Sequence, residues 1–178
     1  MRMPSHWTYA GWFTLLRIYA GIFWLVHGIP KFLNAPMFMP PDGFIVKAVQ
    51  NGLTTHHGAY HAFLANVVLP NINLFAELVR LGEVLTGCAL LLGIFTRFAG
   101  LIGCILALNY FTLNGGFGSW TNVGSLDAAA FMLSLMFLAV PAGRVAGVDA
   151  LLYRPRSARV RAITPEVVDE PPPQAPPG

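Results

Sequence analysis

Charged residues are scarce in this sequence. Only 11% of its 178 residues are Asp, Glu, Lys or Arg, while 55% are hydrophobic. Soluble domains carry about 25% charged residues, so this balance excludes an ordinary soluble domain and indicates an integral membrane protein. We therefore expect membrane lipid, and no nucleic acid, as a partner. The length suits one compact bundle.

Motifs for a resident redox group are also missing. The two cysteines, Cys88 and Cys104, do not form a C-x-x-C motif, and there is no haem-attachment motif and no glycine fingerprint for a dinucleotide. A buried haem usually needs two facing histidines, and only His27 lies within a clear span. The sequence thus has no haem, flavin or iron–sulfur signature. Electrons have to pass directly between bound substrates or come from a partner.

Four apolar stretches approach the roughly 20 residues that cross a membrane. They lie at about 11–33, 74–95, 97–115 and 122–141. Arg17 interrupts the first and no cleavage site follows it, so we expect this stretch to stay as an anchor. Two shorter stretches, 42–53 and 58–69, have the apolar spacing of interfacial helices. The predicted fold class is all-α: an integral membrane four-helix bundle with an outer interfacial cap between helices 1 and 2.

Basic residues predict the orientation of the bundle, because cytoplasmic flanks collect Lys and Arg. Seven arginines fall at the termini and at the turn between the second and third spans: Arg2, Arg97, Arg144, Arg154, Arg156, Arg159 and Arg161. The opposite side has Lys47 and the border residue Lys31. Both termini should therefore be cytoplasmic. We expect a membrane domain at 1–152 and a basic, then proline-rich, disordered tail at 153–178.

Polar side chains interrupt all four spans at one depth. They are His27 and Lys31 on the first span, Glu77, Arg80 and Glu83 on the second, Asn109, Tyr110 and Asn114 on the third, and Asp127 on the fourth. A charge at a helix centre costs about 2.5–3.5 kcal/mol, so these groups need partners. Arg80 can reach Glu77 or Glu83, and Lys31 or a protonated His27 can neutralise the remaining carboxylate. The set is either a salt-bridge network that fixes helix register or a ligand site.

A quinone is one ligand that such a site would suit. It needs an apolar slot for its tail, hydrogen-bond donors at its carbonyl oxygens and two protons when two electrons arrive. Several groups of this set can donate, and Glu83 in apolar surroundings is suited to proton transfer. A sulfur oxyanion would instead seek Arg80, Lys31 and the backbone amides of 114–120. We assign catalytic roles to Glu83, Arg80, Lys31 and Asp127, ligand binding to His27, Glu77, Asn109 and Tyr110, and no metal site.

Two further patterns have simpler structural explanations. His57 and His61 are four residues apart, but no acidic third ligand is close, so we favour an interfacial surface over a metal site. Cys88 and Cys104 each lie eight residues from Thr96, which puts both at a similar depth, about 12 Å from the turn. A redox-active thiol pair is one interpretation, and ordinary buried cysteines are the one we favour.

Three parts of the sequence together resemble a known family. They are "LLRIYAGIFWLVHGIPKFL" at 15–33, "LGEVLTGCALLLGIFTRFAGL" at 81–101 and, after a glycine-rich loop, "GSLDAAAF" at 124–131. In this order they resemble the DoxX and DoxD family of four-helix membrane proteins, over about residues 10–152. The resemblance highlights His27, Gly28, Lys31, Glu83, Gly87, Thr96, Arg97 and Asp127.

Some members of this family are the small subunit of thiosulfate:quinone oxidoreductase. The resemblance therefore implies a protein of the bacterial or archaeal inner membrane that acts in sulfur metabolism, joining two thiosulfates into tetrathionate and reducing quinone. It also implies a separate DoxA-like second subunit or another redox partner. A homo-oligomer is a further option. Two other functions stay open: a noncatalytic scaffold or assembly factor for a redox protein, and a small transporter.

Overall fold

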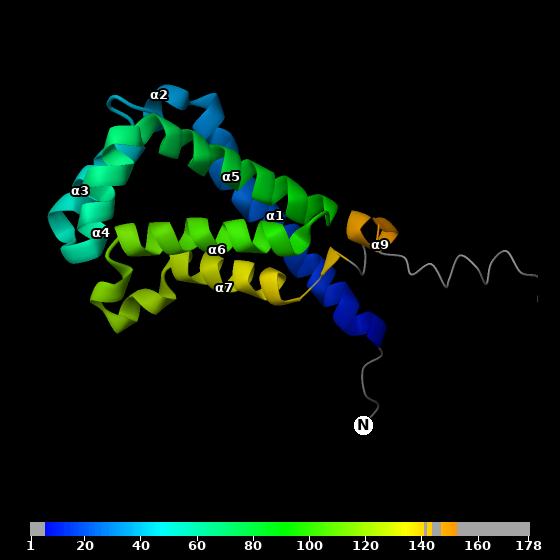
Figure 1. Ribbon diagram of the computed structural model, residues 1–178. Coiled ribbons are helices and arrows are strands. Elements are labelled where there is room, and N and C mark those ends of the chain that lie inside the picture. The colour runs from blue at the N-terminus through cyan, green and yellow to red at the C-terminus, as the bar shows by residue number, and fades with distance from the viewer. Residues whose placement is uncertain (1–5, 141, 144–146, 153–178) are drawn as a thin grey trace, which may run out of the picture.

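The computed structural model describes residues 6–140, 142–143 and 147–152. In chain order its elements are α1 (His6–Leu33), α2 (Ala35–Phe38), α3 (Phe44–Thr55), α4 (Gly58–Phe63), η1 (Leu64–Val68), η2 (Leu69–Asn71), α5 (Ile72–Leu92), α6 (Thr96–Leu113), η3 (Gly116–Gly118), η4 (Trp120–Gly124), α7 (Leu126–Ala139) and α9 (Val148–Leu152). The predicted all-α membrane bundle is confirmed (Figure 1). The predicted basic run and proline-rich tail lie outside the described residues.

Within the described residues, three helical stretches are long and apolar enough to cross a membrane. They are Gly11–Leu33, Gly58–Leu92 and Thr96–Leu113. The second joins α4, η1, η2 and α5, and it changes direction at η2, where Pro70 lies (Figure 1). The two shorter segments that the sequence predicts as interfacial are both helical, as α3 and as α4 with η1.

The fourth helix, α7, is shorter than the predicted span at 122–141. It has 14 residues, which rise about 21 Å, whereas the hydrocarbon core is about 30 Å thick. Ser125 sets its start, because the Ser125 hydroxyl accepts a hydrogen bond from the amide of Ala128 at 3.2 Å. Val140 ends it in an extended conformation, as expected of a residue that precedes proline.

Two helix pairs form the body of the bundle: α1 packs along α5, and α6 packs along α7. Glycines bring α1 and α5 close together. A Cβ atom added at Gly21 would lie 2.7 Å from Cγ of Leu91 and 3.0 Å from the carbonyl oxygen of Gly87. Small residues of this kind let membrane helices pack by direct backbone contact. The buried core between the pairs includes Trp24 and Phe137.

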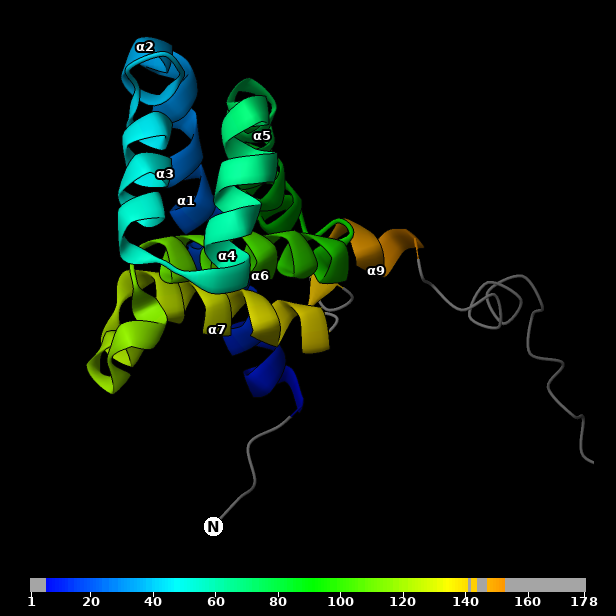
Figure 2. The same ribbon diagram turned by 60° about the vertical axis from the view of Figure 1, so that its left-hand side comes forward.

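Helices α5 and α6 form a V. Gly93 ends α5 in the left-handed conformation, with φ at 67°, and the two helices diverge from this turn (Figure 1). The cap, which consists of α3 and of α4 with η1, lies across the wide end of the V (Figure 2). Val49 of α3 packs there with Leu64 and Val68 of η1, and Leu113 at the end of α6 packs against them.

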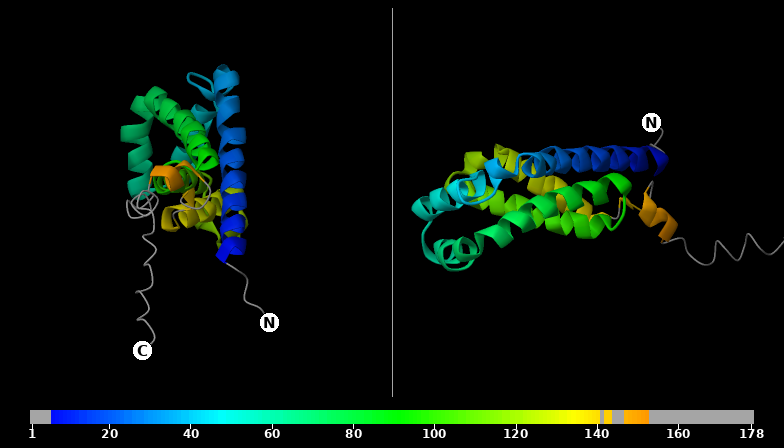
Figure 3. Two further views of the ribbon diagram at one scale, coloured as in Figure 1. Left: turned by 90° about the vertical axis from the view of Figure 1, so that its right-hand side faces the viewer. Right: turned by 90° about the horizontal axis from the view of Figure 1, so that it is seen from above.

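The start of α1, the turn between α5 and α6, and α9 lie at the end of the bundle opposite the cap (Figure 3). A backbone hydrogen bond fixes α9 to the turn, because the amide of Asp149 donates to the carbonyl oxygen of Gly93 at 2.9 Å.

Candidate functional site

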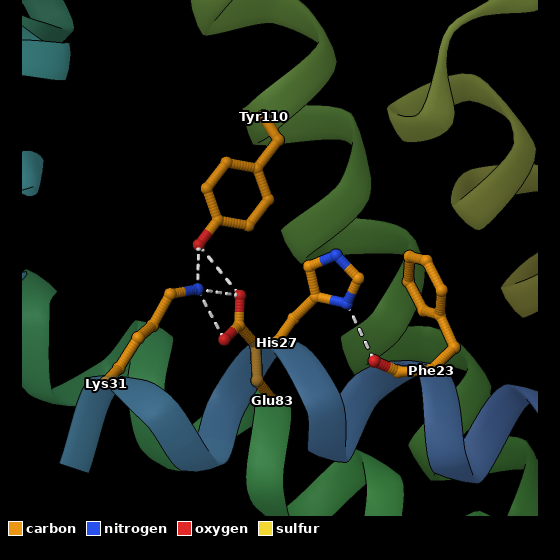
Figure 4. A network of polar contacts seen from close by, with 5 residues as sticks. All are labelled: Phe23, His27, Lys31, Glu83 and Tyr110. Carbon is orange, nitrogen blue, oxygen red and sulfur yellow. Dashed lines mark hydrogen bonds and ion pairs between the residues drawn. The ribbon is translucent and has the colours of Figure 1, made fainter. Parts of the chain in front are cut away.

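Three of the predicted site residues meet in one polar network, shown in Figure 4. Lys31 comes from α1, Glu83 from α5 and Tyr110 from α6. The ammonium of Lys31 forms an ion pair with both carboxylate oxygens of Glu83 and donates a hydrogen bond to the Tyr110 hydroxyl at 2.8 Å. The Tyr110 hydroxyl donates to Oε1 of Glu83, also at 2.8 Å. We call these three residues the polar triad.

The triad places a charge pair inside the bundle. Glu83 is 1% exposed and the Lys31 side chain is 17% exposed. The Lys31 ammonium also lies 5.1 Å from the ring centres of Phe38 and Tyr110, a cation–π distance. A single charge in these surroundings would be costly, but the pair has no net charge. The structure thus gives Glu83 the partner that the sequence requires.

An apolar groove of about 790 Å³ lies beside the triad, between α5 and α6 and under α3 and α4. This volume falls within the roughly 300–1,000 Å³ of small-molecule sites. Tyr110 and Asn109 are among the few polar side chains that line it, and no charged residue does so in the described part of the chain. Tyr110 belongs to both features: it lines the groove, and its hydroxyl is hydrogen-bonded to Lys31 and Glu83.

Arg80 and Glu77 form a separate pair. Nε of Arg80 donates to Oε2 of Glu77 at 2.7 Å. The guanidinium group also lies 4.5 Å from the ring centre of Phe32. The sequence spacing lets Arg80 reach either Glu77 or Glu83. In the structure Arg80 pairs with Glu77, and Glu83 pairs with Lys31.

The other three predicted residues have different contacts. Nδ1 of His27 lies 2.8 Å from the carbonyl oxygen of Phe23, and the exposed imidazole lies beside the Phe23 ring, with ring centres 4.4 Å apart and planes tilted by 38° (Figure 4). Asp127 accepts a hydrogen bond from Asn114 at 2.8 Å. Asn109 donates to the carbonyl oxygen of Ile105 at 2.9 Å and faces the groove. The functional roles of all eight residues stay predictions.

A family model matches residues 12–165, and its description is "TQO small subunit DoxD". The chain belongs to the DoxD family. TQO stands for thiosulfate:quinone oxidoreductase. All three triad residues lie within the matched range. Neither the comparison with curated proteins nor the comparison with solved structures gives a match.

The two cysteines of this DoxD chain are free thiols in different surroundings. Cys88 is exposed, whereas Cys104 is buried and its sulfur lies 3.8 Å from the carbonyl oxygen of Phe131. His57 and His61 belong to no group of three metal-binding side chains in the described part of the chain. Among the described residues, no three His, Cys, Asp or Glu side chains come together.

A second polar cluster, missed by the sequence analysis, lies at the opposite end of the DoxD bundle. The carboxylate of Asp149 accepts hydrogen bonds from the amides of Phe95 and Thr96, at 2.9 and 3.2 Å, and from the Thr96 hydroxyl at 3.1 Å. Arg17, 2% exposed, interacts electrostatically with Asp149. One signal could have found it: Phe95 precedes α6 and has no side chain that can cap a helix, so the cap had to come from elsewhere.

Proposed function

We propose that this DoxD protein is the membrane subunit of a thiosulfate:quinone oxidoreductase, and that quinone is reduced beside Tyr110. One observation carries the proposal: Tyr110 lines an apolar groove, and its hydroxyl contacts a buried Lys–Glu pair. An apolar pocket with a few convergent polar groups is the usual form of a small-molecule site. Membership of the family supports the redox system, and the groove supports the position.

The triad has the chemistry that quinone reduction needs. A quinone that receives two electrons takes up two protons to become a quinol. The Tyr110 hydroxyl can donate the first proton to a quinone oxygen, and the Lys31 ammonium, already hydrogen-bonded to that hydroxyl, can replace it. Glu83 would then carry an uncompensated charge in apolar surroundings, which favours uptake of a proton that restores the Lys31 ammonium. A second transfer along the same path, through Tyr110, would complete the quinol.

Thiosulfate supplies the electrons in this proposal. Joining two thiosulfates into one tetrathionate releases two electrons, which is the number that one quinone accepts. We place this oxidation outside the groove, with a DoxA-like subunit as the partner. The support is electrostatic: Lys31 and Arg80, the cations that the sequence offers to a sulfur oxyanion, each contact a carboxylate, which repels a dianion.

The cellular setting is part of the proposal. We place the protein in the cell membrane of a bacterium or an archaeon, with both termini in the cytoplasm. The start of α1 and α9 lie at one end of the bundle, together with the start of α6, which carries Arg97 (Figure 3). The rule that basic flanks stay cytoplasmic assigns that end to the cytoplasm.

The test is anaerobic quinone reduction by the protein purified with its bound partners, with thiosulfate as the electron donor. Quinone absorbance gives the rate. Glu83→Gln should abolish the reduction, because it removes the charge that holds Lys31. The matched control is Asp149→Asn, which changes a buried carboxylate at the opposite end of the bundle, outside the groove lining, and should retain activity in the folded protein. Normal turnover of the Glu83 variant at equal abundance would contradict the proposal.

A further inference from the structure

Part of the groove lining is exposed on α5 and α6, two helices that are apolar and long enough to cross the membrane. Several residues that line it are also exposed on the lipid-facing surface, among them Leu81 and Leu85 of α5, at 44% and 64%, and Ile105 of α6, at 49%. These side chains form the two rims of the opening between α5 and α6. A ligand that crosses them comes from the lipid and not from water.

The cap packs closely against the end of α6. At Gly52 of α3, an added Cβ atom would lie 2.6 Å from Leu113 of α6 and 2.9 Å from Leu64 of η1. This close packing narrows the space between the cap and α6. The exposed aliphatic side chains of Leu81, Leu85 and Ile105 mark an approach to the groove between α5 and α6.

We infer that a long-chain quinone enters the groove from the lipid between α5 and α6, with its head at Tyr110 and its prenyl tail lying along both helices toward Phe98. The inference rests on the proposed function and adds the route and orientation of the ligand. Phe98 and Tyr110 both line the groove and are 12 residues apart on α6, which spans about 18 Å. The groove is therefore much longer than a quinone ring needs.

The lining chemistry selects a quinone over a phospholipid. A phosphate head group would lose its water in the groove, and the described residues that line the groove include no cation to replace that water. A quinone head is neutral and needs hydrogen-bond donors. In the inferred orientation the head lies at Tyr110, whose hydroxyl is a donor. The tail needs apolar walls, and the rest of the groove consists mainly of them.

Photolabelling of the full-length protein in phosphatidylcholine vesicles tests the orientation without relying on turnover. One long-chain quinone carries a diazirine on its ring, and a second carries it at the end of the tail. We expect the ring probe to label residues 106–113 and the tail probe to label residues 85–102. Tail labelling on the outer face of α1, or the same labelled residues for both probes, would overturn the inference.

A pair of variants on α6 gives a second measurement. Ile105→Trp places a bulky side chain at the rim, whereas Leu108→Trp, at a residue 42% exposed and outside the groove lining, is the matched control. Ile105→Trp should weaken binding of a long-chain quinone at least tenfold and leave a tailless quinone unchanged. Leu108→Trp should change neither. Equal binding by both variants would overturn the inference.

Failure of the route and failure of the proposed function give different results. Thiosulfate-dependent reduction of quinone with tail labelling outside the groove would leave the function and reject the route. If neither probe labels the protein, both the route and the proposed function are rejected. A photoreactive phospholipid that labels the groove and is not displaced by excess quinone would show that lipid is the occupant, which also overturns the inference.

Discussion

The Glu83 carboxylate and the Lys31 ammonium form an ion pair inside the bundle although they lie 52 residues apart in the chain. Glu83 is 1% exposed, so each charge depends on the other for compensation. Lys31→Met should lower the free energy of unfolding by about 3–5 kcal/mol, because it leaves a buried carboxylate unpaired. The double variant Lys31→Met/Glu83→Leu should recover most of this loss. Chemical unfolding in detergent measures both.

The control for this cycle is Glu77→Gln, whose carboxylate pairs with Arg80 and is far more exposed than that of Glu83. Its effect on unfolding should stay below about 1 kcal/mol. The double variant should also be stable but unable to reduce quinone, which separates the role of the pair in folding from its role in the proposed reaction. A double variant as unstable as the worse single variant would contradict the interpretation.

Tyr110→Phe removes the hydroxyl that contacts both charges and keeps the ring on the groove wall. We expect a loss of about 1–2 kcal/mol in stability and a fall of about 100-fold or more in the rate of quinone reduction, because a proton donor is lost. Tyr60→Phe is the matched control, since Tyr60 also lines the groove but does not contact the triad. Equal rates in the two variants would show that the Tyr110 hydroxyl takes no part.

Gly28→Ala tests the close approach that positions Glu83. A Cβ atom at residue 28 would lie 2.9 Å from Cβ of Glu83 and 3.0 Å from the backbone nitrogen of Val84, so α1 and α5 would have to separate. We expect a loss of about 1–3 kcal/mol from overpacking. Gly11→Ala on the same helix has no atom within 4 Å and should have little effect. Similar unfolding curves for both variants would argue against the close helix contact.

The depth of the triad could be predicted from the sequence, but its composition could not. The rise along each helix places Lys31, Glu83 and Tyr110 at one level once the spans are known. Their contact also depends on how each helix is rotated about its axis. Glycine contacts such as that at Gly28 set this rotation between α1 and α5, and a hydropathy pattern does not contain it.

The groove and the short α7 escaped prediction for related reasons. The groove exists because α5 and α6 diverge from the turn at Gly93, a property of their packing against different neighbours. The limits of α7 follow from the Ser125 cap and from Val140, which precedes a proline. These are local signals, and a count of apolar residues does not detect them. Hydropathy predicts which segments enter the membrane, but it is a poorer guide to the residue at which each helix ends.

Asp149 joins α9 to the start of α6, and its removal tests whether this distant end of the bundle matters for folding alone. Asp149→Ala deletes three hydrogen bonds to Phe95 and Thr96 and the charge facing Arg17. We expect a loss of about 2–3 kcal/mol, since a helix cap is lost and buried donors are left without an acceptor. Asp149→Asn keeps an acceptor oxygen and should cost less, so the difference between the two variants separates hydrogen bonding from charge.

The Asp149 variants should lose stability without losing affinity for quinone. The groove lining does not include Asp149, Arg17 or Thr96, so binding of a long-chain quinone to the folded variant should equal that of the wild type. Photolabelling and unfolding measured on the same preparations separate the two effects. An Asp149→Ala protein that unfolds like the wild type would mean that α9 does not stabilise the turn. A variant that folds normally but loses quinone would mean that the two ends of the bundle are coupled.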